Sequence, residues 1–399
     1  MKPGLKTAIN LGIAVASFVL TLELAACSDR ILGHFLREKV WPGPMGLLFP
    51  PGMEAEFDTH DYQCSERINS LGFRDYETPV RKTHQCRVVV IGDSFTYGWG
   101  VNVEDTWCKR VEQSLRQQGM DVEILNLGKP AAGPDDYVNI ANTVVPILQP
   151  DLVVVGMLAG DDLQQLDLIG NPERIALAKF PNAVRLLHYL RNRPLYKNAS
   201  PQAKRSAEDT RAEYVQAAQE LLRQMGPEQR QRFDQIEEPV RKAFHEGQLN
   251  PWLLGHTTGC PDYFMETLDA DNLKMTTWLL TRDFRRIRKT ADRWNARTVV
   301  LSIPEGFYVN DEAFMNVKRI GFQVLPEMLT SNAPDEVVRR ASAQAGVSFH
   351  AVTEEFRKHR NETGLFFEFD RHFTPAGNAL YADLVTPLLA REIREAIGP

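Results

Sequence analysis

The stretch RVVVIGDSFTYG, residues 87–98, joins an apolar run to a turn that contains a serine. Arg87–Ile91 is short and rich in valine, as a buried strand of a parallel sheet should be. Ser94 follows directly, between Gly92 and Gly98 and ahead of a helix-favouring segment. This order predicts that Ser94 lies at the carboxyl edge of a sheet, beside free backbone N–H groups and a positive helix end. The alternative is a tight turn in which Ser94 only caps the helix.

The rest of the chain alternates apolar runs with helix-favouring segments. We expect four further strands, Val122–Leu125, Asp151–Met157, Thr298–Ile303 and Val347–Phe349, and helices near residues 104–118, 134–148 and 375–397. Strands separated by helices predict an α/β fold with a parallel, doubly wound sheet of about five strands.

Between the third and fourth strands, residues of about 170–293 carry no strand signal and are rich in Gln, Glu, Arg, Lys and Ala. This composition predicts a large helical insertion. It follows the carboxyl end of a strand, where open α/β sheets bind ligands. A lid over the site and a structural elaboration away from it are therefore equal alternatives.

Composition limits the class of protein. The chain has 399 residues, 43% of them hydrophobic, and a formal net charge of −6, which excludes disorder throughout and argues against a nucleic-acid partner. The basic run Arg282–Arg293 is expected to be the solvated face of an amphipathic helix. Contact with lipid headgroups or an anionic polymer is the alternative.

The N-terminal residues 1–27 have the pattern of a targeting segment. Lys2 and Lys6 precede the apolar stretch Ala8–Leu22, and Leu24-Ala-Ala-Cys27 resembles the lipobox of bacterial lipoproteins. Cys27 is then expected to carry lipid, and Ser28 after it favours the outer membrane. An uncleaved N-terminal anchor helix is the alternative. In either case the body is expected on the periplasmic side of a bacterial cell envelope, held at a membrane.

Residues 28–66 are expected to be a tether and lead-in, and residues 67–399 the folded domain. Four cysteines remain beside Cys27, namely Cys64, Cys86, Cys108 and Cys260. An even number in an oxidising compartment predicts disulfides, with three possible pairings.

A second motif, FDRHFTPAGN at residues 369–378, supplies a histidine. A serine nucleophile needs a general base, and that base needs an acceptor which fixes its tautomer. His372 and Asp370, two residues apart in a loop ahead of the last helix, are the candidates for these roles.

The two motifs together, GDSFTYG and the late D-x-H-x-x-P-x-G, resemble the SGNH (GDSL) hydrolase superfamily. The resemblance covers about residues 68–162 and 298–397. It implies a flavodoxin-like three-layer α/β/α fold and ester cleavage by Ser94 with His372 and Asp370. This chemistry needs no metal and no organic cofactor, and no residue spacing in the sequence suggests one.

Two middle blocks of the family depart here from its pattern. In Asn126–Gly133 the glycine expected five residues after the asparagine is Ala131, and Gly133 is the other candidate for a backbone donor to the oxyanion. In the third block the family has an asparagine donor where this chain has Asp161. An ionised carboxylate cannot donate a hydrogen bond, whereas a protonated one could.

The expected function is hydrolysis of carbohydrate acetyl esters or lipid esters through an acyl-serine intermediate. Backbone N–H groups of Ser94 and of Ala131 or Gly133, with Asp161, would hold the oxyanion. One alternative is an extracytoplasmic polysaccharide O-acetyltransferase that uses the same three residues. The other is a catalytically weakened domain that binds envelope glycans.

Overall fold

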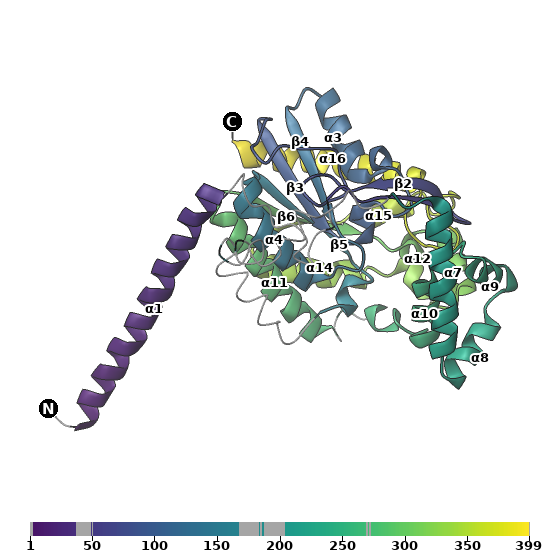
Figure 1. Cartoon of the computed structure of the whole chain (residues 1–399), viewed down its shortest axis with the longest axis horizontal. Helices are drawn as coiled ribbons and strands as arrows, with labels where there is room; N and C mark the ends of the chain where they lie inside the picture. Colours follow the sequence, from purple (N-terminus) through teal and green to yellow (C-terminus); the bar gives the residue numbers. More distant parts are fainter. Residues whose placement is uncertain are drawn as a thin grey trace.

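Five parallel strands form the central sheet in the order β4-β3-β5-β6-β7 (Figure 1). In this computed structural model they are β3 (Cys86–Gly92), β4 (Val122–Gly128), β5 (Leu152–Leu158), β6 (Arg297–Ile303) and β7 (Ser348–His350). The structure describes residues 3–36, 49, 51–166, 183, 186, 204–268, 270 and 273–398. The first strand of this sheet along the chain is β3. Strand β4 adds on one side of it and β5, β6 and β7 on the other, which confirms the predicted doubly wound α/β fold.

Helices cover both faces of the sheet. One face carries α4 (Pro134–Leu148), α11 (Lys274–Asp292) and α14 (Ala333–Ala345), and the other carries α3 (Trp107–Gln117) and α16 (Pro375–Ile397). Neighbouring residues of β3 alternate between the two cores: Val88 and Val90 pack with α3 and α16, and Val89 and Ile91 pack with α4, α11 and α14. A strand buried on both faces therefore reads as a continuous apolar run.

Shorter helices connect these elements. They are α2 (Ser94–Tyr97), α12 (Gly306–Val309), α13 (Asp311–Arg319) and α15 (Thr353–Arg357), with the 3-10 helices η1 (Val103–Asp105), η2 (Asp162–Gln164), η3 (Met265–Leu268) and η4 (Pro326–Thr330).

The stretch between β5 and β6 is helical where the structure describes it. Helices α7 (Ala207–Gln224), α8 (Pro227–Gln235), α9 (Glu238–His245) and α10 (Pro251–Gly259) lie together at the end of the molecule opposite α1 (Figure 1). Phe244 of α9 and Phe264, in the turn that follows α10, pack with Phe307 of α12 in one continuous core. Helix α11 also falls in this stretch, yet it packs against α4 and α14 as part of the α/β/α sandwich.

A β-hairpin occupies much of the segment expected to be tether and lead-in. Strands β1 (Glu54–Asp58) and β2 (Gln63–Arg67) pair antiparallel. The inward-facing Phe57 and Cys64 pack in a small core with Tyr214 of α7 and with Phe367 near the C-terminus. The folded body thus begins near residue 54, while most of the proline-rich stretch 40–52 lies outside the described residues.

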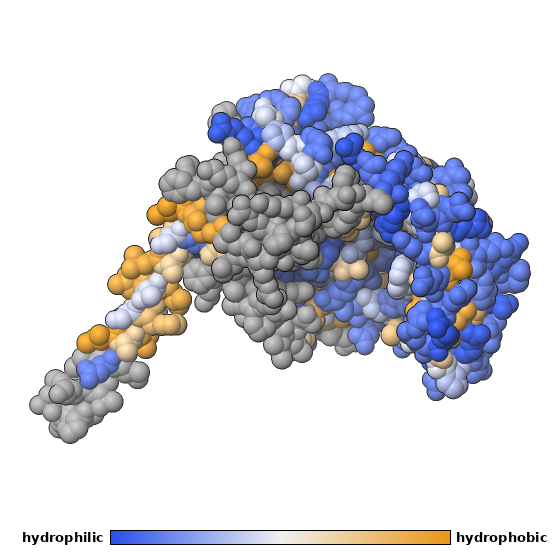
Figure 2. Space-filling view, in the orientation of Figure 1, coloured by the Kyte–Doolittle hydropathy of each residue, from blue (hydrophilic) through white to orange (hydrophobic). Residues whose placement is uncertain are grey.

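Helix α1 (Pro3–Leu36) runs without a break through Cys27 and projects from the body (Figure 1). Figure 2 shows apolar side chains along it, and the described ones that are more than half exposed are Ile13, Val15, Phe18, Leu20, Leu24 and Ile31. Within the described residues, no helix combines the length and apolarity needed to cross a membrane.

The expected disulfides are absent: all five cysteines, which lie within the described residues, are free thiols. Cys64 is buried beneath the hairpin, whereas Cys86 and Cys108 lie in the core on the α3 side of the sheet. Cys260 is exposed at the end of α10. Burial raises the pKa of the Cys64 and Cys86 thiols to about 12 and keeps them protonated at neutral pH.

Candidate active site

Ser94 is the first residue of α2, directly after β3. The N-cap is Asp93 rather than Ser94, because the Asp93 carboxylate accepts a hydrogen bond from the Phe95 N–H at 3.0 Å. Gly92 lets the turn close, since a Cβ there would lie 2.2 Å from Thr96 Oγ1 and 2.8 Å from the carbonyl oxygen of Gly156. The serine side chain is therefore free of the capping role and only partly buried.

His372 connects this serine to Asp370. Its Nε2 lies 2.7 Å from Ser94 Oγ, and its Nδ1 is hydrogen-bonded to Asp370 Oδ1. The His372 side chain is 14% exposed and that of Asp370 is 3% exposed. Between them, Arg371 has a φ of 73°, so the chain turns sharply in the left-handed region. The three predicted residues, 278 positions apart along the chain at the extremes, meet at the carboxyl edge of the sheet.

Two aromatic residues that sequence reasoning missed complete this side of the site. The Trp99 indole N–H lies 2.9 Å from the Tyr62 hydroxyl and 3.3 Å from Asp370 Oδ2. The centroid of the His372 ring lies 4.8 Å from that of Phe95 and 6.2 Å from that of Trp99. Trp99 lies five residues after Ser94, and this closeness in the sequence could have indicated a place in the site. No local pattern in the sequence indicates such a place for Tyr62.

The backbone donors expected for an oxyanion lie on two loops, one after β3 and one after β4. As the first residue of a helix, Ser94 has no intrahelical partner for its N–H. Ala131 has a φ of 57°, so it holds the left-handed conformation that a glycine adopts freely. Gly133 is the N-cap of α4, and a Cβ there would lie 2.9 Å from the side chain of Gln165. Gly133 is therefore covered by Gln165, while Ala131 is exposed.

Asn126 fixes the second of these loops. Its Nδ2 donates to the Thr96 carbonyl at 2.7 Å, and its Oδ1 accepts from the Gly128 N–H at 2.9 Å. The amide thus ties the end of β4 to α2.

Asp161 follows β5, as predicted, with a half-buried side chain. Its Oδ2 accepts a hydrogen bond from Gln165 Nε2 at 2.7 Å. In this arrangement the Asp161 oxygen acts as an acceptor. The insertion reaches the same loop, because the Tyr263 hydroxyl lies 3.4 Å from the Asp161 carbonyl oxygen.

Further carboxylates crowd this side of the site. Burial, and next the charge of Asp161, raise the pKa of Asp93. Burial, and next Asp93 and Asp161, raise the pKa of Asp162, which accepts from the Tyr137 hydroxyl at 2.9 Å and from the Leu158 N–H at 2.9 Å. Clusters of buried acids with raised pKa values are typical of functional sites.

Glu305, just after β6, belongs to the same cluster. Its side chain is fully buried, and neither carboxylate oxygen makes a hydrogen bond within the described part of the chain. Burial, and to a lesser degree Asp161, raise its pKa to about 7 against the opposing charge of Arg371. The Arg371 guanidinium lies 3.8 Å from Glu305 and 5.3 Å from the ring centroids of both Phe264 and Phe322.

One group of side chains has atoms close enough to share a metal ion among the residues that the structure describes, namely His60, Asp61 and Glu368. Asp61 already accepts backbone hydrogen bonds, and Glu368 pairs with Arg319 at 2.5 Å. These contacts engage both Asp61 oxygens and Glu368 Oε1.

Comparison with known proteins identifies a family. Residues 90–257 match the GDSL-like Lipase/Acylhydrolase family. This span contains Ser94 and Asp161, whereas Asp370 and His372 lie beyond it. No curated protein matched the chain.

Several solved structures are similar in part. A lipase/acylhydrolase from Enterococcus faecalis is 12% identical, with 77% of this chain and 97% of that chain covered and a TM-score of 0.36. The psychrotrophic esterase EstA from Pseudoalteromonas sp. is 9% identical, with 77% and 98% covered and a TM-score of 0.36. The acetyl xylan esterase AlAXEase is 12% identical, with 76% and 99% covered and a TM-score of 0.37.

At such low identities and TM-scores these likenesses assign no substrate to this chain. The family match agrees with two features of the structure: the five-stranded parallel sheet, and the contact of His372 with Ser94 at its carboxyl edge. Over residues 90–257 the match supports a member of the SGNH (GDSL) hydrolase superfamily, whose enzymes hydrolyse ester bonds.

Proposed function

We propose that this protein is a serine esterase of the bacterial cell envelope that cleaves carbohydrate acetyl esters or lipid esters through an acyl-Ser94 intermediate. The observation that carries the proposal is the continuous contact from Ser94 Oγ to His372 Nε2 at 2.7 Å and from His372 Nδ1 to Asp370. A serine within hydrogen-bond reach of a base that a carboxylate orients is the arrangement that nucleophilic acyl transfer needs.

The first half of the reaction forms the acyl-enzyme. Asp370 accepts the Nδ1–H of His372, so Nε2 is free to take the Ser94 proton. Ser94 Oγ attacks the acyl carbonyl and a C–O bond forms. The tetrahedral intermediate then collapses, the ester C–O bond breaks, and His372 returns the proton to the leaving alcohol.

The second half releases the acid. Water attacks the acyl carbon, His372 takes its proton, and Ser94 leaves with that proton. Backbone N–H groups of Ser94 and Ala131 are the donors that we assign to the developing oxyanion, with Gly133 set back beneath Gln165. Asp161 contributes a donor only when it is protonated.

The test is fluorophosphonate labelling of the full chain beside its Ser94→Ala variant. Labelling that disappears in the variant supports an activated serine. Absence of labelling in a folded wild-type protein would contradict the esterase and favour the glycan-binding domain, with Asp161 as the disabling residue.

Substrate class and acceptor are tested next. A p-nitrophenyl ester series from acetate to long acyl chains separates acetyl esters from lipid esters. Adding a polysaccharide acceptor separates hydrolysis from transfer: release of free acid alone supports the esterase, whereas acyl groups found on the sugar support the O-acetyltransferase.

The cell-envelope location rests on the N-terminal segment. Cys27 is exposed on α1, a helix that exposes several large apolar side chains. Metabolic labelling with an alkyne fatty acid should mark the wild type and a Cys260→Ala control, but not Cys27→Ala. Membrane retention without lipid on Cys27 would instead indicate the uncleaved anchor helix.

A further inference from the structure

The turn of the β1–β2 hairpin reaches the loop that carries Asp370 and His372. Asp61 Oδ1 accepts a hydrogen bond from the Glu368 N–H at 3.1 Å. Asp61 Oδ2 accepts from the Phe369 N–H at 3.0 Å and from the Asp370 N–H at 2.8 Å. One carboxylate thus binds three consecutive backbone N–H groups, the last of them that of Asp370, two residues before His372.

Neighbouring residues of the turn strengthen this contact. The His60 ring stacks on Phe369 with centroids 4.5 Å apart, and His60 Nε2 lies 3.2 Å from Glu368 Oε2. On the other side of Asp61, the Tyr62 hydroxyl contacts Trp99, whose indole N–H also lies 3.3 Å from Asp370 Oδ2. Residues 60–62 therefore hold both the backbone and the side chain of Asp370.

This arrangement places the carboxylates of Asp61 and Asp370 close together, and their charges repel each other. Burial, and next the charge of Asp370, raise the pKa of Asp61 to about 6, although its hydrogen bonds and His60 oppose the shift. Asp61 is therefore mainly ionised at neutral pH, where hydrogen bonds from N–H groups to a carboxylate are at their strongest. A loop that needed only to be ordered could use a neutral acceptor without that repulsion.

We propose that Asp61 is a positioning residue of the active site: it holds the backbone of residues 368–370 so that Asp370 meets His372 Nδ1 and His372 Nε2 meets Ser94 Oγ. The N-terminal hairpin lies outside the span that matches the family, yet through Asp61 it positions residues of the active site. The kinetic consequence of this role rests on the proposed esterase function.

The first test compares Asp61→Asn with Asp58→Asn. Asp58 is an exposed carboxylate of the same hairpin whose contact is with Gln63 Nε2 at 2.8 Å. Asparagine offers one acceptor oxygen where aspartate offers two, so the loop should shift. We expect Asp61→Asn to lower kcat about 10- to 100-fold with KM little changed, and Asp58→Asn to match the wild type.

The second readout does not need turnover. The Nδ1–H of His372, bound to Asp370, should give a downfield proton NMR resonance that disappears in His372→Ala. In Asp61→Asn it should move upfield or broaden, and in Asp58→Asn it should stay. A folded Asp61→Asn variant with unchanged resonance and unchanged kcat would overturn the proposal.

A third measurement uses the wild type alone and so survives a variant that fails to fold. The amide hydrogens of Glu368, Phe369 and Asp370 should lose protection against exchange as the pH falls through about 6, where Asp61 gains a proton beside the charges of Asp370 and His60. Constant protection factors over this range would contradict the role of Asp61. An inactive wild type that showed the resonance and this protection would count against the esterase but not against Asp61.

Discussion

Acidic side chains gather at the carboxyl edge of the sheet, where Asp93, Asp162 and Glu305 are buried in the loops around Ser94. Toward the amino edge lies a patch of exposed basic residues, called the basic edge here: α11 ends one loop before β6 and presents Arg285, Arg288, Lys289 and Arg293. The acidic cluster around Ser94 and the basic edge thus differ in both the sign and the burial of their charges.

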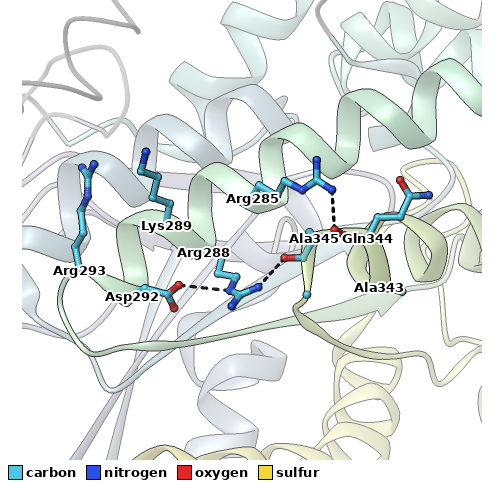
Figure 3. Close-up of a pocket in the computed structure, with 9 residues that line it drawn as sticks. Arg285, Arg288, Lys289, Asp292, Arg293, Ala343, Gln344 and Ala345 are labelled. Atoms are coloured by element: carbon cyan, nitrogen blue, oxygen red, sulfur yellow. Dashed lines mark hydrogen bonds and ion pairs between the residues drawn. The ribbon is translucent and has the colours of Figure 1, made fainter. Parts of the chain in front are cut away.

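The basic edge is a shallow hollow of about 660 Å³ between α11 and the end of α14 (Figure 3). Arg285 donates to the Gln344 carbonyl at 2.9 Å, and Arg288 donates to the Ala345 carbonyl at 3.0 Å. Lys289 and Arg293 make no hydrogen bond or ion pair within the described part of the chain. The basic run is thus the exposed face of an amphipathic helix, as the sequence predicted.

Helix dipoles account for the sign of each edge but not for the burial. The N-terminus of α2 faces the carboxyl edge and the C-terminus of α14 faces the amino edge, which favours anions at the first and cations at the second. Exposed cations at a helix end cost little. Buried acids raise one another's pKa values and destabilise the fold, so their presence near Ser94 points to a role in the chemistry.

The largest effect should come from Ser94→Ala. Removing the nucleophile should lower kcat by about 10⁴-fold or more, because the contact between Ser94 and His372 acts as a unit. The melting temperature should barely change, since the variant loses one hydrogen bond of a partly exposed hydroxyl. Ester hydrolysis and calorimetry together check both parts. Turnover equal to the wild type would contradict the role of Ser94.

Asp161→Asn should have the next largest effect, in the opposite direction. An amide can donate to the oxyanion where the carboxylate cannot, so kcat should rise by about tenfold or more at neutral pH.

Asp162→Asn is the matched control for this increase. The Asp162 carboxylate is held by Tyr137 and by the Leu158 N–H, so this variant should not raise kcat. If Asp161→Asn leaves kcat unchanged or lowers it in a folded protein, Asp161 is not the limiting residue of the site.

Glu305→Gln should change how stability depends on pH. The pKa of Glu305 is about 7 in the folded state against 4.5 ordinarily. Between these values the unfolded chain has released the proton that the folded chain still holds, so stability falls as the pH rises from 4.5 to 7. The fall from this group is about 3 kcal/mol.

Denaturant unfolding of Glu305→Gln across this range should show a shallower decline than the wild type. Asp61, with its pKa of about 6, contributes a decline of the same sign in both proteins, so the difference between the two curves isolates Glu305. Parallel curves would mean that Glu305 does not titrate between these pH values.

The smallest effect is expected at the basic edge. Lys289→Ala and Arg293→Ala remove exposed cations without a partner among the described residues, so each should change the free energy of unfolding by no more than about 0.5 kcal/mol and leave kcat unaltered. Lower activity in either variant would contradict this expectation, because it would mean that the basic edge influences catalysis at the opposite edge of the sheet.

Local sequence predicted the sheet and its serine well. Each expected strand is present, because β-branched runs buried on both faces have few other solutions. Disulfides were predicted from the number of cysteines alone, and none is present: Cys64 packs in a different core from Cys86 and Cys108, and Cys260 is exposed at the end of α10. The β1–β2 hairpin went unrecognised, since its polar-apolar alternation over five-residue strands is a weak signal beside a proline-rich stretch.

By itself, the sequence determined the order of strands and helices and the presence of Ser94, Asp370 and His372 at their ends, because these follow from local periodicity and turn chemistry. Only the tertiary structure decided which groups surround them. Asp61 and Tyr62 reach the Asp370 loop across about 300 residues of chain. Arg371 contacts Glu305 because of a turn that no local sequence pattern predicts. Such contacts depend on how loops from distant strands converge at one edge, and that convergence is a property of the packed sheet rather than of any segment.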